Sequence, residues 1–153
     1  MFRGFMVKID RKLEHALIIL NHLSKSKSDK LYTAKELSVL YDIAFDSASR
    51  VMQRMASNGF LTSVQGPVGG YRVTSDLNEK NLLELLKAIS KKSVKIAKCI
   101  GGSCDKRSIC NIVDPVESLN DKLTEFYSSI ELDELLCLKV WYEWSKTYKF
   151  RWK

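Results

Sequence analysis

The sequence predicts a mainly helical fold with one small β-hairpin, and three observations support this class. Apolar residues recur at steps of three and four, as they do on the buried face of an amphipathic helix. Capping residues stand before several of these stretches. Two short strand-like segments flank a single glycine-rich turn at residues 66–70. With 153 residues, of which 45% are hydrophobic, the chain is long enough to bury a core.

Three helices are expected before the hairpin. Asp10 can cap the first, and its expected buried face consists of Leu13, Ala16, Leu17, Leu20 and Leu23. Thr33-Ala-Lys-Glu36 reads as a capping box that opens the second helix, with Leu37 and Leu40 facing inward. Asp46 is expected to cap the third helix, which should end at Asn58-Gly59. The expected apolar stripe of this third helix is Val51, Met52 and Met55.

The expected strands cover residues 60–65 and 71–74. Two helices joined by a tight turn and followed by a hairpin make a winged helix-turn-helix. The third helix is then the recognition helix, which enters the major groove of DNA. The fold class is therefore mainly α with a small β-hairpin wing.

The second half of the chain is expected to be helical around a cysteine-containing loop. A helix is expected over 78–89, with five apolar positions: Leu82, Leu83, Leu85, Leu86 and Ile89. Asp114-Pro115 is expected to cap and open a long helix that runs to about Ser128. Its apolar stripe, suited to pairing with a second copy, is Val116, Leu119, Leu123, Phe126 and Tyr127. A further helical stretch is expected from Glu131.

These elements divide the chain into four parts. The winged helix-turn-helix domain covers 6–77, and a linking helix with the cysteine loop covers 78–114. The dimerisation helix covers 115–136, and an aromatic and basic extension covers 137–153. That extension could contact DNA or a membrane surface, although packing back on the dimer is the preferred interpretation.

The charge distribution favours a polyanionic partner. The net charge is +7, and residues 1–75 hold eleven Lys or Arg against six Asp or Glu, which leaves a local balance of +5. No apolar run is long enough to cross a bilayer, and the first residues do not form a secretory signal, so we expect a cytoplasmic protein without a membrane partner. In such a reducing compartment, clustered cysteines are more often ligands or redox sensors than structural disulfides.

The recognition helix supplies the first candidates for DNA contacts. Arg50 suits a base edge, because a guanidinium can bind the O6 and N7 atoms of guanine together. Ser47 and Ser49 suit bases or phosphates, and Arg54 adds a positive charge. The alternative for the two arginines is an ordinary solvated helix face.

Two other parts of the predicted domain could also contact DNA. Thr33 and Lys35, at the start of the preceding helix, suit phosphate binding. Gly69 and Gly70 permit close approach of the hairpin backbone to phosphates or to the minor groove. A plain tight turn is the alternative for this glycine pair.

Three cysteines, Cys99, Cys104 and Cys110, lie within twelve residues. Thiolates this close on a short, glycine-containing loop favour a soft-metal or iron–sulfur site. The loop carries positive side chains that favour thiolates: Lys95, Lys98, Lys106 and Arg107. Cys137 lies on an apolar stripe and is interpreted as a buried small residue.

A DNA-binding module joined to a metal-binding loop is the outline of a cluster-dependent transcription factor, and two alternatives to it are open at this stage. The cysteines could act without metal as a thiol–disulfide switch, or they could hold structural zinc, which normally needs four protein ligands. An enzyme is not expected, because no nucleophile triad or pair of catalytic carboxylates is recognisable. Both histidines, His15 and His22, lie on the first predicted helix.

The stretch from Asn58 to Tyr71, Asn-Gly-Phe-Leu-Thr-Ser-Val-Gln-Gly-Pro-Val-Gly-Gly-Tyr, resembles the wing of the Rrf-two family of winged helix-turn-helix transcriptional regulators, of the IscR, NsrR and RirA type. The resemblance extends over about residues 6–136, with the recognition helix, wing, three cysteines and long helix in the same order. It implies a homodimer on a double-stranded DNA operator and an iron–sulfur cluster, with [2Fe–2S] placed ahead of [4Fe–4S]. The cluster would report iron supply, redox state or nitric oxide, and the regulator would act as a repressor.

The resemblance also assigns individual residues. It implies that Cys99, Cys104 and Cys110 ligate the cluster, and that Glu14 of the partner subunit's first helix is the fourth ligand, with His15 as the alternative. On the wing it adds Gln65 and Tyr71 to Gly69 and Gly70 as DNA-binding positions. Glu14 and His15 could equally be exposed helix residues.

The sequence departs from the family pattern in four places. The cysteines are separated by four and five residues, where five and five is commoner. Val113 occupies the position where some members place a histidine ligand, and Gln65 replaces a common wing arginine. The extension after about Leu138 continues past the usual end.

Overall fold

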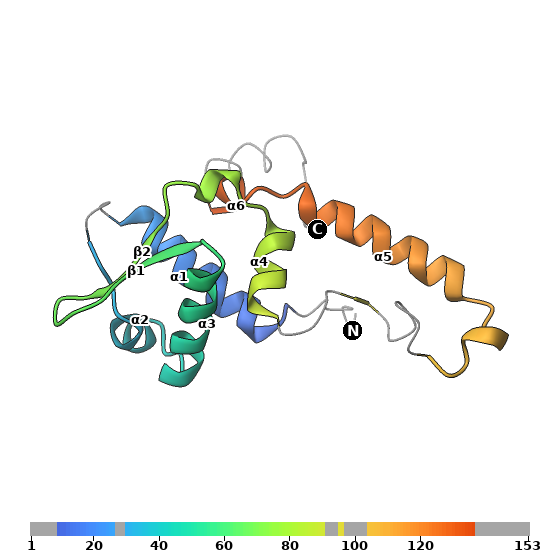
Figure 1. Cartoon of the computed structure of the whole chain (residues 1–153), viewed down its shortest axis with the longest axis horizontal. Coiled ribbons are helices and arrows are strands. Elements are labelled where there is room, and N and C mark those ends of the chain that lie inside the picture. The colour runs from blue at the N-terminus through green and yellow to red at the C-terminus, as the bar shows by residue number, and fades with distance from the viewer. Residues whose placement is uncertain (1–8, 27–29, 91–94, 97–103, 137–153) are drawn as a thin grey trace, which may run out of the picture. The chain divides into compact units, whose positions relative to one another are not determined.

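The computed structural model describes residues 9–26, 30–90, 95–96 and 104–136. The chain divides into two compact units, Met1–Ser75 and Asp76–Lys153 (Figure 1). The division into four parts expected from the sequence, with a first boundary at residue 77, stays a prediction. Cys99, Cys137 and the extension 137–153 lie outside the described residues. No helix of the described part is both long and apolar enough to span a bilayer.

The first unit consists of three helices and a hairpin. The helices are α1 (Arg11–Lys25), α2 (Ala34–Leu40) and α3 (Phe45–Ser57). Strands β1 (Leu61–Val64) and β2 (Gly70–Val73) pair antiparallel, with Leu61 opposite Val73 and Val64 opposite Gly70. The hairpin extends away from the helices (Figure 1). Element order and topology confirm the predicted mainly helical winged helix-turn-helix.

The core of the first unit lies where α3 packs against α1, α2 and β1. The fully or nearly fully buried side chains on α3 are Ala48, Val51, Met52 and Met55. Helix α1 buries Leu13, Ala16, Ile19, Leu20 and Leu23, so Ile19 replaces the half-buried Leu17 of the predicted face. Leu37 is buried as predicted, but Leu40 is 59% exposed, which corrects the prediction that it faces inward. Helix α2 ends at Leu40 and the chain turns at residues 41 and 42, so Leu40 lies at the exposed end of the helix in the described part of the chain.

The helix caps confirm two predictions and correct two others. The side chain of Asp10 accepts from the backbone N–H of Lys12 at the start of α1. Thr33 and Glu36 form the predicted capping box of α2. Asp46 does not cap α3, because Ala44 occupies the N-cap and offers no side-chain bond. Likewise α5 begins at Val113, one residue before the expected cap Asp114, so Asp114 lies inside the first turn.

The second unit has short elements around two longer helices. A 3-10 turn, η1 (Leu77–Glu79), precedes α4 (Leu82–Ile89), so the helix expected over 78–89 is interrupted. The break arises because Asn81 caps α4 in a second capping box with Glu84. Another 3-10 turn, η2 (Arg107–Ile109), leads to α5 (Val113–Ser128) and α6 (Leu132–Leu136). Helices α4 and α5 are in contact, and α6 packs on η1.

Candidate DNA-binding face and cysteine segment

The outward face of α3 carries the strongest candidates for base contacts. Asp46, Arg50 and Gln53 are exposed and follow one another at steps of four and three, on the side opposite the buried residues. Ser49 is half-buried beside them, and Gln53 Nε2 donates to its Oγ over 3.4 Å. Arg54 is half-buried at the flank of this face. Arg50 therefore lies on an accessible surface, and Ser49 borders it.

Ser47 lies on a different side of α3. Its Oγ is 2.8 Å from Nδ1 of His15 on α1, in a partly buried hydrogen bond. This bond ties the first turn of α3 to α1 and engages the Ser47 hydroxyl. His15 thus has one ring nitrogen engaged, while its neighbour Glu14 is exposed. The DNA role of Ser47 and the ligand roles of Glu14 and His15 stay predictions.

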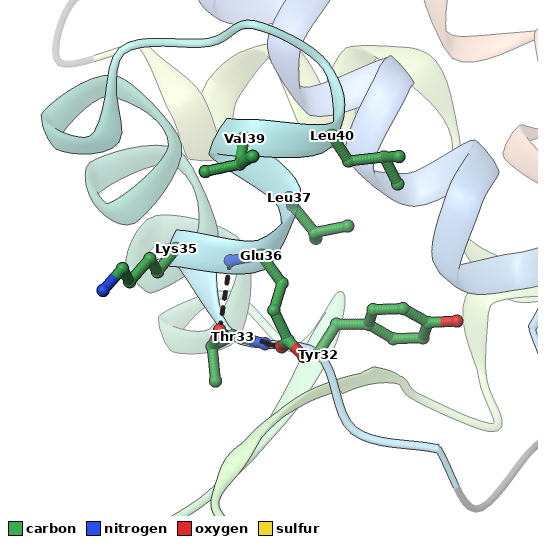
Figure 2. A pocket seen from close by; sticks show the side chains of 7 residues that line it. All are labelled: Tyr32, Thr33, Lys35, Glu36, Leu37, Val39 and Leu40. Atoms are coloured by element: carbon green, nitrogen blue, oxygen red, sulfur yellow. Dashed lines mark hydrogen bonds between the residues drawn. The ribbon is translucent and has the colours of Figure 1, made fainter.

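The start of α2 already holds a negative charge. The Glu36 carboxylate accepts from the backbone N–H of Thr33 over 2.7 Å and from the Thr33 hydroxyl over 2.8 Å (Figure 2). Two hydrogen bonds from Thr33 lower the pKa of Glu36 below its usual value. The bond from the backbone N–H has the larger effect, and the bond from the hydroxyl adds to it. A DNA phosphate at this helix end would meet that carboxylate. Lys35 is exposed and its ammonium points away from Glu36, so it is the better phosphate candidate of the two predicted here (Figure 2).

An open hollow of about 500 Å³ lies along α2. Its lining includes Val39 and Leu40, which are 77% and 59% exposed. The lining side chains in Figure 2 converge on no common point and carry no cluster of polar groups beyond the capping box. We assign this hollow no ligand.

Close approach of the backbone within the fold favours glycine at both Gly69 and Gly70 of the wing. A Cβ on Gly69 would stand 2.3 Å from the carbonyl oxygen of Val64, so only glycine closes this turn. Gly70 is buried, and a Cβ there would stand 3.0 Å from the backbone of Tyr32. The exposed tip of the wing is formed by residues 65–68, including Gln65 and the 88% exposed Val68. Contacts of Gly69 and Gly70 with DNA stay predictions.

The base of the wing is fixed by Tyr32. Its backbone exchanges two hydrogen bonds with Tyr71, of 3.0 and 2.9 Å, which joins the segment before α2 to β2. The Tyr32 ring stands edge-on to His22, and His22 Nδ1 lies 2.8 Å from the Tyr41 hydroxyl in the helix-turn-helix turn. A hydrogen bond from Ser26, with a further contribution from Lys30, lowers the pKa of Tyr32. These contacts set the angle between the wing and the helix pair.

The cysteine segment, residues 95–110, is described at 95–96 and 104–110. Cys104 and Cys110 are unpaired, half-buried thiols at the two ends of a compact turn. The Cys104 carbonyl accepts from the backbone N–H of Arg107, which begins η2. No group of three His, Cys, Asp or Glu side chains converges within the part of the chain that is described, and Cys99 lies outside it.

Two polar contacts anchor the cysteine segment to α5. The Arg107 guanidinium makes an ion pair with Glu117, with a 2.8 Å separation between Nη2 and Oε1. The backbone N–H of Ile96 donates to Oδ1 of Asn120 over 3.4 Å. Glu117 and Asn120 are three residues apart and therefore adjacent on the same side of α5. Ile96 and Arg107 are thus both held by the same helix.

The described thiols fit an iron–sulfur cluster by their chemistry. Thiolates are the usual ligands of such clusters, and Cys104 and Cys110 are neither consumed in a disulfide nor sealed in the core. Arg107 places a positive charge on the turn between them. Cys99 would be the third ligand on the chain.

Sequence reasoning overlooked the residues that support these sites. Asp46 was interpreted only as a cap, and Gln53 was not assigned a role on the outward face. Glu117 and Asn120 were not recognised as anchors, because a charge or amide on a long helix carries no signal of its partner in a loop. The Asn81-x-x-Glu84 pattern could have located the true start of α4.

The structure has a winged helix-turn-helix with an accessible recognition helix. It also has a thiol-bearing turn that is anchored to a long helix. Together these features define a class of winged helix-turn-helix regulators. The chain belongs to the Rrf2 family, described as iron-dependent transcriptional regulators, whose profile matches residues 9–137. The family consists of regulators and not enzymes, in agreement with the prediction from the sequence.

A relative supports the same assignment, and solved structures share the fold. The chain is 31% identical over 102 residues to the HTH-type transcriptional regulator IscR of Photorhabdus laumondii, and the match covers 66% of this chain. The chain spans about 62% of the length of that curated relative. The fold is similar to that of T. potens IscR, with 14% identity, a TM-score of 0.62 and coverage of 96% of this chain and 93% of the other. It is also similar to CymR, the global cysteine regulator of B. subtilis, with 18% identity, a TM-score of 0.55 and coverage of 86% and 97%.

Proposed function

We propose that this protein is a homodimeric, DNA-binding transcriptional regulator, a repressor, whose activity depends on an iron–sulfur cluster held by Cys99, Cys104 and Cys110. The observation that carries the proposal is the pair of unpaired, half-buried thiols on a turn anchored to α5, in a member of a family described as iron-dependent. The expected cytoplasmic location belongs to the same proposal.

The DNA side of the proposal rests on α3. A helix that enters the major groove must present long polar side chains on a face that the core does not need. Arg50 meets this requirement, because it is exposed and has no ion-pair partner among the described residues. Lys35 on α2 and the exposed wing tip belong to the same unit and would contact the phosphate backbone.

The cysteine side of the proposal concerns what the chain does for the cluster. The ion pair between Arg107 and Glu117 fixes the turn that separates two of the thiols, so less freedom is lost when ligands converge. The positive charge of Arg107 favours the thiolate form of neighbouring cysteines. A bound cluster would supply a group sensitive to iron supply, redox state or nitric oxide, with [2Fe–2S] expected ahead of [4Fe–4S]. The fourth ligand would be Glu14 of the partner subunit, or His15.

The dimer would form through α5. Ile112, Leu119 and Phe126 are 55%, 50% and 57% exposed and recur every seven residues. The half-buried Val116 and Leu123 complete a spacing of four, three, four and three, which is the pattern of coiled coils. A second copy of the chain, placing the same stripe against this one, would cover these side chains.

Anaerobic purification of the full chain tests the proposal. We expect a coloured protein with visible absorption, containing iron and acid-labile sulfide, and a change in DNA binding when the iron is removed. Cys104→Ala should lose the iron while the far-ultraviolet circular dichroism spectrum stays unchanged. Ser103→Ala, beside the same thiol, is the matched control and should keep the iron. Retention of iron and colour by the Cys104 variant would contradict the ligand assignment.

A thiol–disulfide switch is the second candidate, because the same two unpaired thiols could react without metal. The anaerobic purification distinguishes the cluster-dependent regulator from the thiol–disulfide switch. A colourless, iron-free protein whose DNA binding follows thiol oxidation would support the switch and overturn the cluster.

A further inference from the structure

The side chain of Asp46 has no polar partner in the described part of the chain. It lies in the first turn of α3, is exposed, and contributes no cap, because the helix begins after Ala44 without a side-chain bond. Its charge is favourable near a helix N-terminus, which is the one structural role left to it. That role needs only a carboxylate somewhere in the first turn, and does not require this face.

The position of Asp46 is the informative observation. It lies one helical turn before Arg50 on the side of α3 opposite Met52 and Met55. Side chains at this spacing are close enough to pair, yet no ion pair joins Asp46 and Arg50, and neither side chain has another polar partner among the described residues. Both charged groups are therefore available to a ligand that meets this face.

A carboxylate on a DNA-facing surface is unfavourable unless it forms a specific bond. Phosphates repel it, so it weakens sequence-independent binding. It can compensate by accepting a hydrogen bond from an amino group on a base edge, and the N-terminal residues of a recognition helix are those that reach such edges. We infer that Asp46 is a specificity-determining residue that accepts a hydrogen bond from the N4 amino group of a cytosine in the operator. This inference rests on the proposed DNA-binding function.

Cytosine is favoured over adenine by the acceptor pattern of the major groove. Adenine presents its N6 amino group beside the N7 acceptor, and N7 would face the second oxygen of the carboxylate. Cytosine presents the N4 amino group without a neighbouring acceptor of its own. An asparagine at position 46 reverses this preference, because its amide can bond adenine N6 and N7 together. The substitution Asp46→Asn has nearly the same shape, so it changes chemistry more than packing.

The test is a selection of bound duplexes from a library with a randomised centre. The full chain, purified anaerobically, is used as wild type and as Asp46→Asn. We expect the wild-type consensus to hold a cytosine in each half-site that becomes adenine in the Asp46→Asn consensus. Binding to single wild-type and substituted duplexes should show a change of about tenfold in the ratio of the two affinities. Asp42→Asn is the matched control, because it removes an exposed carboxylate four residues away, in the turn before α3.

The outcomes separate this inference from the function on which it rests. If wild type selects no consensus, the proposed DNA-binding function fails. If wild type selects a consensus that Asp46→Asn leaves unchanged at every position, Asp46 serves the helix alone and the inference is overturned. A loss of cytosine preference shared equally by Asp42→Asn would show a general charge effect and would overturn it as well.

Discussion

Helices α3 and α5 differ in how their apolar side chains are covered. The 13-residue α3 buries Ala48, Val51, Met52 and Met55 within the single chain. The 16-residue α5 is longer but buries none of its residues, and Leu119 and Phe126 stay about half exposed. Helix α3 is thus stabilised by its own unit, whereas α5 has an apolar stripe that the described residues leave exposed. On the proposed function, one chain would hold a complete recognition helix, whereas α5 would need a second copy to cover its stripe.

The largest expected effect is on the core beneath α3. Met52→Ala removes a fully buried side chain and should lower the free energy of unfolding by about 2 to 5 kcal/mol. Urea unfolding followed by circular dichroism measures the change. Gln53→Ala, on the exposed neighbour, should stay within about 0.5 kcal/mol of wild type. Equal destabilisation by both variants would break the contrast between the two faces of α3.

The next effect concerns the open stripe of α5. Leu119→Glu should convert the dimer to a monomer, because each copy loses the burial of a leucine, which is about 1.5 to 3 kcal/mol. The circular dichroism of the monomer should change little, since Leu119 is already 50% exposed in the single chain. Sedimentation velocity reports the assembly state. Ser118→Glu adds the same charge outside the stripe and should leave the dimer intact; a dimeric Leu119 variant would show that α5 is not the interface.

A smaller effect concerns the capping box that orients α2 beside α3. The hydrogen bonds from Thr33 lower the pKa of Glu36, so the ionised carboxylate stabilises the folded state at neutral pH. This contribution is present at pH values above the ordinary pKa of 4.5. It is lost as the pH falls through the lowered pKa of Glu36 in the folded state. Glu36→Gln should therefore be less stable than wild type at pH 7, by about 0.3 to 1 kcal/mol.

Urea midpoints at neutral and acidic pH measure this difference, which should shrink as the pH falls below 4.5. Asp42→Asn is the control, because Asp42 is an exposed acid of the same unit that makes no hydrogen bond within the described residues. If the difference in urea midpoint between Glu36→Gln and wild type does not change with pH, the stabilisation by the capping box depends on the shape of the side chain and not on its charge.

The smallest expected effect concerns the anchor between the cysteine segment and α5. Glu117→Gln removes an ion pair that is partly exposed, so the free energy of unfolding should change by less than about 1 kcal/mol. Iron should leave the protein two to five times faster in the presence of a chelator, roughly the factor that this energy allows. Absorption spectroscopy measures the rate. Glu125→Gln, on an exposed residue of the same helix, should match wild type.

Local signals in the sequence identified most of the fold because they depend on neighbouring residues. The Thr33–Glu36 box, the Asp10 cap and the hairpin around residues 66–70 each need only a few adjacent side chains. The misassignments of Asp46 and Asp114 as caps had a different cause. Both acids lie inside the first turn, where a carboxylate is also favourable, so the same residue type is expected one or two positions away from the cap.

The candidate site was only partly accessible to sequence reasoning. The types and spacing of Arg50, Cys104 and Cys110 already indicated a base contact and thiol ligands. The contact of Ser47 with His15 was not predictable, because it joins residues 32 positions apart through the packing of two helices. The anchoring of Arg107 by Glu117 is similar, since a charged residue in a loop gives no sign of which helix will face it.

The sequence by itself therefore determined the order of the helices, the hairpin, the cysteine-bearing turn and the basic character of the first unit. These follow from periodicity, capping chemistry and charge, which are properties of residues close together in the chain. Only the tertiary structure decided which side of α3 is open, that Ser47 bonds α1 while Asp46 and Arg50 are exposed, and that no residue of α5 is buried within the described part of the chain. Exposure depends on which distant segments pack against a helix, and no local pattern contains that information.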